Sequence, residues 1–589
     1  MGNRGGRPNA PHIRYEQPRG RTARSNKKKR GCGGCLFILI GIGILIISIW
    51  KGFDGWWPNN EIAESDMSKV EQPLTWNGAW SGYGTKGRGE ELLIPLEALQ
   101  KKLPIAFEAK SNTVILTSAK DVASLQLGQA KGTWNGKAKR WDAAAENIDG
   151  DVYIPIGVLE EMYGLHARQY SSNGAVQLGF PGQSLQAGVI AEQKNDDDTV
   201  AMRQEADNRS AIVQKLAGAT ELTIWKERDD WVYVEADGGA LGYLPKEDVK
   251  YTDKRVIPDT APPPKPRFVE EKKPVSLAWE AVYSRNPDPS KLPSMPGTNV
   301  ISPTWFSLAD NEGNVTSKGD LSLSNWAHRK GKQVWALYSN SFEPERTTEA
   351  LSTFERRSRT IEQLLKLAEQ YQVDGINLDY ENVNVEDRDQ LTQFVRELAP
   401  RMHAQGLVIS IDVTAKSSSG RWSQFLDREK LGEAVDFMMV MAYDEHWAAS
   451  PVAGSVASLP WVEQSVARIM DEDKVPAHKL VLGMPLYTRI WTEEVKDGET
   501  KVSSKSVGMR TIQELMQEQE LKPVFSEQTG QNYVEYKEDG AVKKIWIEDE
   551  RSVQARIELA QRLGLGGIAV WARSFADSDI WNVIHYPAS

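Results

Sequence analysis

Three polar residues alternate in the stretch Asp374–Glu381, which reads Asp-Gly-Ile-Asn-Leu-Asp-Tyr-Glu. In a β-strand, Asn377, Asp379 and Glu381 share one face, and the apolar residues between them share the other. Two carboxyl groups on one buried face are costly unless they are paired or carry out chemistry. Carboxyl groups in such a setting supply the proton transfers of general acid–base catalysis. The alternative is a solvated carboxylate at a strand end.

The surrounding sequence alternates strand-like and helical segments over residues 275–589. The predicted strands are Val275–Trp279, Val300–Ser302, Gln333–Leu337, Gly375–Asp379, Val408–Asp412, Phe437–Met441, Leu480–Gly483 and Ile568–Trp571. This order predicts a (β/α)8 TIM barrel, with Glu381 at the mouth formed by the strand C-termini. Residues 506–550 are too many for a loop, so we expect a small insertion before the last helix and strand.

At these residues the chain resembles glycoside hydrolase family 18, the chitinase-like family. The strand-four signature of that family, Asp-Gly-x-Asp-x-Asp-x-Glu, is matched at Asp374, Gly375, Asp379 and Glu381. The resemblance extends over most of the C-terminal region. Further family motifs follow in the same order, at Met441–Asp444, Gly483–Trp491 and Trp571.

Asn377 departs from the signature, which has an Asp at this position. In the family that Asp shares a proton with the next one. An Asn can donate a hydrogen bond to Asp379 but cannot take up charge. We therefore expect an effect on rate and pH profile, and none on reaction type. The Asn also resembles the branch of spore-cortex and cell-wall N-acetylglucosaminidases.

The resemblance implies a retaining mechanism in which the 2-acetamido oxygen of the substrate is the nucleophile. Glu381 would protonate the leaving oxygen and then activate water. Asp379 would hold the acetamido N–H, and Tyr443 would bind the acetamido oxygen. The implied substrate-binding residues are Asn377, Asp374, Asp444, Trp571, Tyr487, Arg489 and Trp279. No cofactor is implied, and the seven His show no metal-binding spacing.

Trp279, Trp305, Trp447 and Trp491 lie near the ends of predicted strands. Tryptophan rings stack on the apolar faces of sugars, and they also fill protein cores. The sequence leaves both interpretations open for each of these four residues.

Two small modules are expected upstream of the barrel. Residues 73–182 contain a repeat, in which Leu93–Leu99 recurs as Tyr153–Leu159, and they resemble the copper amine oxidase N-terminal-like module. This α+β module would be a spacer or a wall-binding unit, or duplicated packing without a ligand. Residues 199–251 are rich in short strands and resemble a bacterial SH3-like β-barrel. Residues 252–274 form a Pro-rich linker.

The N-terminal region predicts a membrane anchor. Residues 1–30 hold ten basic residues and one acidic residue, and residues 31–50 are uncharged and long enough to span a bilayer as one transmembrane helix. The alternative is a cleaved signal peptide, but no small-x-small site follows. The basic flank predicts a cytoplasmic N-terminus, with a stalk at 51–72 and all later modules outside the cell.

The net charge and the cysteine content of this multidomain chain limit the kinds of partner and of cross-link that it can have. The 589 residues carry a net charge of -10, and the basic tail leaves the rest strongly acidic, which argues against nucleic acid as a partner. The only cysteines, Cys32 and Cys35, lie in the predicted anchor, so the exported part has no disulfides. We expect a hydrolase that cleaves β-1,4 bonds of N-acetylated glycans, either peptidoglycan or a chitin-like glycan, and the bacterial-type modules and outward topology favour peptidoglycan. The alternative is a lectin-like cell-wall protein, although retention of Glu381 favours the enzyme.

Overall fold

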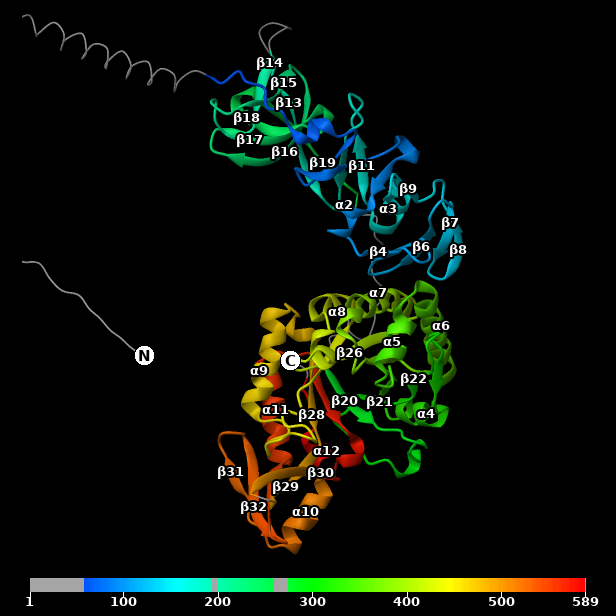
Figure 1. The fold of residues 1–589 in the computed structure, drawn as a ribbon, viewed down its shortest axis with the longest axis vertical. Helices are drawn as coiled ribbons and strands as arrows, with labels where there is room; N and C mark the ends of the chain where they lie inside the picture. Colours follow the sequence, from blue (N-terminus) through cyan, green and yellow to red (C-terminus); the bar gives the residue numbers. More distant parts are fainter. Residues whose placement is uncertain (1–57, 193–198, 259–273, 497, 588–589) are drawn as a thin grey trace, which may run out of the picture.

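The C-terminal region is a closed barrel of eight parallel strands in a computed structural model that describes residues 58–192, 199–258, 274–496 and 498–587 (Figure 1). The barrel strands are β20 (Val275–Glu280), β21 (Val300–Pro303), β24 (Gln333–Ser339), β25 (Gly375–Asp379), β26 (Val408–Thr414), β27 (Phe437–Met441), β28 (Leu480–Pro485) and β34 (Gly567–Trp571). Neighbours in this order pair in parallel, and β34 pairs with β20 to close the ring. All eight predicted strands and the TIM barrel are confirmed.

Helices cover the outside of the barrel because every strand alternates its side chains between two faces. Ile376 and Leu378 of β25 pack outward against the helical layer, whereas Trp335 and Phe437 fill the lumen. The helices are α4 (Leu321–Arg329), α5 (Pro344–Leu351), α6 (Phe354–Tyr371), α7 (Arg388–Ala404), α8 (Arg428–Ala434), α9 (Leu459–Glu472), α11 (Glu550–Arg562) and α12 (Ile580–Val583). Thr353 and Asp549 cap the first turns of α6 and α11 with their side chains.

An inserted α+β subdomain follows β28, as predicted. Its elements are β29 (Tyr487–Lys496), β30 (Glu499–Gly508), α10 (Met509–Glu518), β31 (Val524–Ser526), β32 (Gln531–Glu538) and β33 (Ala541–Ile547). The five strands form an antiparallel sheet. The subdomain begins at Tyr487, earlier than the predicted 506, because β29 is the long first arm of a hairpin. This difference brings Tyr487 and Arg489 to the base of the insertion, beside the barrel mouth.

The predicted repeat upstream consists of two strand–helix units. In the first, β3 (Leu93–Pro95) leads into α2 (Leu96–Gln100), and in the second, β10 (Asp151–Pro155) leads into α3 (Ile156–Tyr163). The two strands pair antiparallel with Ile94 opposite Ile154, so the units share one core. The module also contains β1 (Pro73–Trp76), β2 (Ala79–Gly84), β4 (Ile105–Glu108), β5 (Thr113–Thr117), β6 (Val122–Gln126), β7 (Lys131–Trp134), β8 (Lys137–Arg140), β9 (Glu146–Ile148), β11 (His166–Gln169) and β12 (Val176–Gly179).

A seven-stranded antiparallel sheet follows the repeat module. It contains β13 (Ser184–Ile190), β14 (Thr199–Arg203), β15 (Ile212–Ala217), β16 (Glu221–Arg228), β17 (Trp231–Ala236), β18 (Leu241–Pro245) and β19 (Val249–Val256). Strand β13 precedes the predicted range 199–251 and pairs with both β16 and β19. Buried Glu235 accepts hydrogen bonds from Thr75 and Tyr170 of the repeat module, which ties the two modules together.

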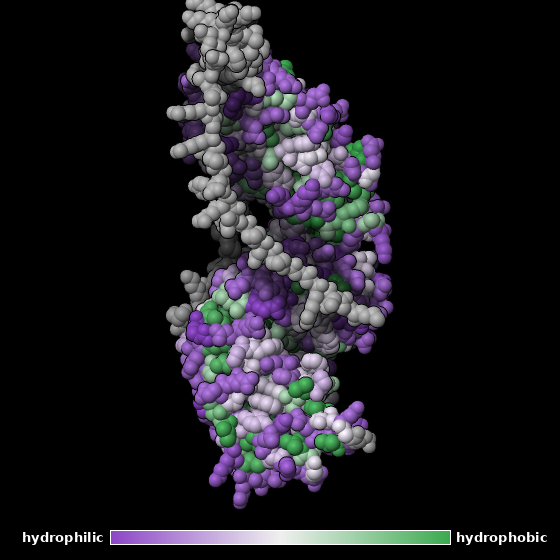
Figure 2. All heavy atoms as spheres, turned by 60° about the vertical axis from the view of Figure 1, so that its left-hand side comes forward, coloured by the Kyte–Doolittle hydropathy of each residue, from purple (hydrophilic) through white to green (hydrophobic). Residues whose placement is uncertain are grey.

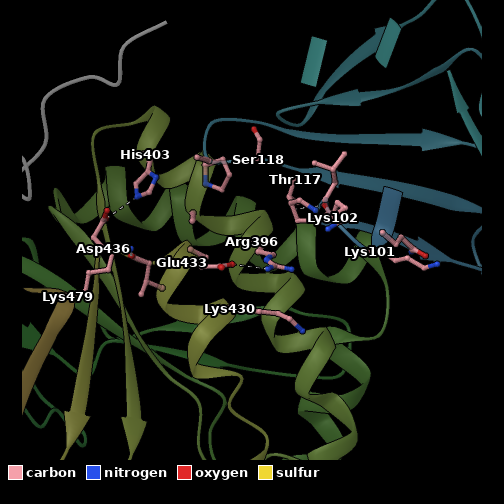
Figure 3. Close-up of a pocket in the computed structure, with 18 residues that line it drawn as sticks. Lys101, Lys102, Thr117, Ser118, Arg396, His403, Lys430, Glu433, Asp436 and Lys479 are labelled. Atoms are coloured by element: carbon pink, nitrogen blue, oxygen red, sulfur yellow. Dashed lines mark hydrogen bonds and ion pairs between the residues drawn. The ribbon is translucent and has the colours of Figure 1, made fainter. Parts of the chain in front are cut away.

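The repeat module also packs on the barrel, at the end opposite the insertion (Figure 1). Arg357 of α6 is buried between Glu108 of β4, at 2.6 Å, and Glu397 of α7, at 2.7 Å. A polar pocket lies along the same contact and includes Lys101 of the module and His403 of α7 (Figure 3). The outer face in Figure 2 is mainly hydrophilic, with hydrophobic residues in small separate groups.

The predicted tail at 1–30 and transmembrane helix at 31–50 lie outside the described residues, as do 51–57 of the stalk and most of the linker at 252–274. Within the described part of the chain, none of the helices has the length and apolar character needed to span a bilayer.

Candidate active site

The predicted polar row of β25 faces the barrel lumen. Asn377 is fully buried, while Asp379 and Glu381 are half-buried further toward the mouth. The Asn377 amide accepts a 2.8 Å hydrogen bond from Nε1 of Trp279 and donates one of 2.7 Å to Oδ1 of Asp412. The possible hydrogen bond from Asn377 to Asp379 is not formed, because the amide nitrogen donates to Ser410 and Asp412 instead.

Asp412 is a member of this carboxyl cluster that sequence reasoning missed. It lies on β26 and is buried. The parallel register pairs Leu378 with Ile411, which places Asp412 beside Asp379 on the next strand, with both side chains toward the lumen. The available signal was the alternation in the predicted strand Val408–Asp412, where Ser410 and Asp412 share one face and Ile409 and Ile411 share the other.

Burial and mutual repulsion keep this cluster from being fully ionised. Burial raises the pKa of Asp379 to about 7. Burial, and then the charge of Asp379, raises the pKa of both Glu381 and Asp412. A carboxyl group that stays protonated near neutral pH can act as a general acid. Glu381 is the carboxyl nearest the mouth, and the upward shift of its pKa is in the direction that suits this role.

The backbone of Glu381 is held by a residue that no sequence pattern indicated. Asn340, at the end of β24, accepts a 3.1 Å hydrogen bond from the Glu381 N–H and donates one of 2.8 Å to its carbonyl oxygen. The same amide donates to Oγ1 of Thr347 at 2.9 Å. Asn340 is fully buried, so it fixes the position from which the Glu381 side chain starts.

Four predicted residues meet at the side of the mouth formed by β27 and the insertion. Asp444 accepts hydrogen bonds from the Tyr487 hydroxyl at 2.5 Å and from Arg489 at 2.7 Å. Its side chain is 44% exposed, so one edge of the carboxylate is open to a ligand. The Tyr443 ring packs edge-on against Tyr487, and burial, followed by Asp412, raises the pKa of its hydroxyl. The Tyr443 hydroxyl is therefore a neutral donor.

Trp571 is the last residue of β34, at the mouth end of the barrel, and its contact with a sugar stays a prediction. The half-buried Trp571 packs on Trp279 with ring centroids 6.1 Å apart. Nearby, Arg573 pairs with buried Glu280. This ion pair joins the C-terminal end of β20 to the segment after β34.

Asp374 is not part of the site, and its predicted contact with substrate is wrong. It precedes β25 and binds His328 at 2.9 Å and the backbone N–H of Val334 at 2.8 Å. Seven residues of extended chain separate it from Glu381, a distance of about 23 Å. Asp374 therefore stabilises the end of the barrel opposite the mouth.

Several predicted sugar contacts are core residues instead. Trp279 is 1% exposed and lies beneath Trp571, and Asn377 has no exposed surface, so the predicted substrate contacts of both are wrong. Trp305 and Trp491 are also buried. Trp447, which is 55% exposed after β27, is the one of the four tryptophans that is free to meet a sugar. No group of three or more His, Cys, Asp or Glu side chains arranged to hold a metal occurs in the described ranges.

A TIM barrel whose mouth presents a carboxyl with a raised pKa beside a second carboxyl and a tyrosine hydroxyl is typical of the glycoside hydrolase class of enzymes. Residues 308–576 match the family model described as glycosyl hydrolases family 18, and the C-terminal part of the chain is therefore a family 18 domain. Residues 87–178 match the copper amine oxidase N-terminal domain, and residues 196–250 match the bacterial SH3 domain. These matches confirm the three resemblances.

Of three relatives of the chain, two are named glycosylases, and the third is named a cortical fragment-lytic enzyme. The chain is 29% identical over 300 residues to the uncharacterized glycosylase YvbX of Bacillus subtilis (strain 168), which covers 49% of this chain and 83% of that protein. It is 28% identical to the putative sporulation-specific glycosylase YdhD of the same organism, over 46% of this chain and 67% of that protein. It is also 28% identical to the cortical fragment-lytic enzyme of that organism, over 38% of this chain and 52% of that protein.

Proposed function

We propose that the protein is a membrane-anchored, extracellular glycoside hydrolase that cleaves β-1,4 bonds next to N-acetylated sugars. The observation that carries this proposal is the arrangement of Glu381 and Asp379 on one lumen face, with Glu381 toward the open mouth and with raised pKa values for both. A protonated acid above a second carboxyl is what substrate-assisted cleavage requires.

In the proposed reaction, Glu381 gives its proton to the glycosidic oxygen as the bond from that oxygen to the sugar C1 breaks. The acetamido oxygen of the same sugar bonds to C1 and forms an oxazolinium ion. Because C1 is attacked twice, once by this oxygen and once by water, the product retains the anomeric configuration. In the second step water attacks C1 as the bond between C1 and the acetamido oxygen breaks, which restores the acetamido group, and the attacking water gives a proton back to Glu381. The enzyme itself makes no covalent bond, and the protons balance over the two steps.

The neighbouring groups orient the acetamido arm. Asp379, as a carboxylate, accepts the acetamido N–H and stabilises the positive charge of the oxazolinium. The Tyr443 hydroxyl donates a hydrogen bond to the acetamido oxygen, and Asp444 accepts a hydrogen bond from a sugar hydroxyl. Trp571 supports the apolar face of the sugar ring. The side chain of Asp444 enters the site pre-oriented because Tyr487 and Arg489 already hold one of its oxygens.

Peptidoglycan is the favoured substrate. A relative named a cortical fragment-lytic enzyme supports it, as do the bacterial SH3 match and the predicted topology, which places residues after the anchor outside the cell. The repeat and SH3-like modules would then contact the cell wall while the anchor at 31–50 holds the protein at the membrane. Chitin-like oligosaccharides are the alternative glycans.

The test uses the full-length protein in detergent, with purified sacculi and with chito-oligosaccharides, and compares the wild type with Glu381→Gln. We expect the wild type to release reducing ends with retained anomeric configuration and the variant to lose at least about 100-fold in rate. Binding without hydrolysis by both proteins would instead identify a lectin-like protein. Mass analysis of the products from sacculi distinguishes cleavage after N-acetylglucosamine from cleavage after N-acetylmuramic acid.

A further inference from the structure

The amide of Asn377 has a fixed orientation, and this orientation determines which oxygen of Asp412 can carry a proton. An indole N–H can only donate, so the oxygen of the Asn377 amide must be the atom that faces Trp279. The amide nitrogen must then face Ser410, at 3.1 Å, and Oδ1 of Asp412, at 2.7 Å. Oδ1 of Asp412 is therefore always an acceptor, and a proton on Asp412 must reside on its other oxygen, Oδ2.

The second feature is that Asp379 has an unused acceptor. Its Oδ1 is buried and has no hydrogen-bond partner among the described residues. An unpaired buried carboxylate oxygen is costly, and Asp379 sits beside Asp412 across the β25–β26 register. A proton placed between the two carboxyl groups lowers the repulsion and satisfies both.

Among the groups that face Asp412, the hydrogen bond from Asn377 favours the charged form, and the neighbouring carboxyl groups oppose it. Asp379 and Glu381 face it from β25, and the neutral hydroxyl of Tyr443 faces it from the end of β27. No cation acts on Asp412 among these groups. Burial and the two carboxyl neighbours all favour its protonated form.

We propose that Asp412 is a positioning residue of the site, whose Oδ2 holds a proton that it shares with Asp379. Shared in this way, the proton lets Asp379 carry one negative charge without a second one beside it. When the acetamido N–H of a substrate arrives, Asp379 accepts that bond and Asp412 keeps the proton. Asn377 and Trp279 do not touch substrate, and they act by fixing which oxygen of Asp412 is available. This inference rests on the proposed function for its kinetic part only.

The kinetic test compares the full-length wild type with Asp412→Asn, Asn377→Asp and the exchange variant that carries both. The exchange keeps one carboxyl and one amide in contact, and it keeps the carboxyl on the lumen face of β25, two residues from Asp379. We expect Asp412→Asn to lower kcat by roughly 10- to 100-fold with little change in KM and to shift the pH profile. Asn377→Asp alone adds a charge and should also lower kcat at neutral pH. The exchange variant should recover most of the loss.

A second measurement does not depend on activity. Carboxyl 13C NMR of protein labelled at aspartate follows the titration of Asp379, assigned by its loss in Asp379→Asn. We expect Asp379 to titrate roughly one pH unit lower in Asp412→Asn than in the wild type, because coupled groups share their protons. Folding of each variant is checked by its circular dichroism spectrum.

The outcomes are distinguishable. If the wild type is inert on every glycan, the proposed function fails, and the titration of Asp379 alone decides the inference. If the wild type is active but Asp412→Asn keeps its kcat and pH profile, the inference is overturned. An unchanged Asp379 titration, or a loss that the exchange variant does not recover, would show that Asp412 has only a packing role.

Discussion

Asn340 binds both backbone groups of Glu381, through an N–H···O contact of 3.1 Å and an N–H···O=C contact of 2.8 Å. The candidate acid lies just after β25, where the ladder with β24 has ended at the pair Ser339–Asp379. Its backbone would otherwise be free to shift. The side chain of Asn340, the residue directly after β24, thus replaces the hydrogen bonds that the sheet no longer supplies.

Replacing Asn340 should lower activity without removing any group that touches substrate. In Asn340→Ala, Glu381 loses its backbone support, and a misplacement of about 1 Å can cost up to about 100-fold in rate. We expect a fall in kcat on sacculi or chito-oligosaccharides. Asn299→Ala is the matched control, because Asn299 also binds two backbone groups, the Ser276 N–H and the Pro274 carbonyl, but it does so just before β21, at the end of the barrel opposite the mouth, and it should keep wild-type kcat. Equal activity in the two variants would contradict the positioning role of Asn340.

The sequence was sufficient for the barrel because the alternation of apolar residues is a local signal. Ile376 and Leu378 face helices and Asn377 faces the lumen, and this follows from the strand period alone. The motif resemblance then located Glu381, Asp379 and the Tyr443–Asp444 pair in one mouth.

The remaining site residues depend on contacts between distant segments. Asn340 and Asp412 act across strands. No spacing within one segment indicates Asn340, and the alternation in Val408–Asp412 predicts the face on which Asp412 lies but not its contact with Asn377. Trp279 was misassigned because a tryptophan near a strand end fits both a sugar platform and a core. Asp374 was misassigned because membership in a motif does not state at which end of the strand a residue lies.

The raised pKa of Asp379 gives a prediction for stability against pH. A carboxyl whose pKa is near 7 in the folded state and near its ordinary value in the unfolded state binds more protons when folded. Stability from this group is therefore fully present below its ordinary pKa and is lost as the pH rises toward 7. Asp379→Asn should melt like the wild type at pH 4 and a few degrees higher at pH 8, by roughly 2–4 °C for about 1 kcal/mol. Calorimetry of the barrel transition measures this difference.

Asp288→Asn is the control with the opposite sign. Exposed Asp288 has a pKa that is lowered, mainly by its hydrogen bonds from Ser290. The stability that Asp288 contributes is present above its ordinary pKa and is lost in acid. Relative to the wild type, Asp288→Asn should therefore not become more stable between pH 4 and pH 8. A gain in this control equal to that of Asp379→Asn would assign the effect to net charge rather than to the lumen.

Tyr487→Phe tests how Asp444 is held. The variant removes one of the two donors to Oδ1 of Asp444 and leaves Arg489 in place. Hydrogen bonds to charged groups contribute about 1.5–3 kcal/mol, so a loss of roughly 10- to 100-fold in kcat/KM is expected if Asp444 contacts the sugar. The substitution Tyr536→Phe, in the insertion but away from Asp444, provides the comparison. Unchanged kinetics in Tyr487→Phe would show that Arg489 alone is enough to orient Asp444.

Arg357 should contribute more to stability than any exposed ion pair of α6. Its guanidinium lies between Glu397, which has no exposed side-chain surface, and Glu108 of the repeat module. Arg357→Ala leaves the Glu397 carboxylate buried and unpaired, at a cost of about 3–5 kcal/mol in the free energy of unfolding. Arg359→Ala, which breaks exposed pairs with Glu312 and Glu355, should cost about 1 kcal/mol or less. Urea unfolding of both variants measures the two losses, and similar values would mean that water reaches Glu397 in the folded protein. Glu108→Gln should lie between them, since it removes a charge from Arg357 but keeps an acceptor for the N–H of Phe354.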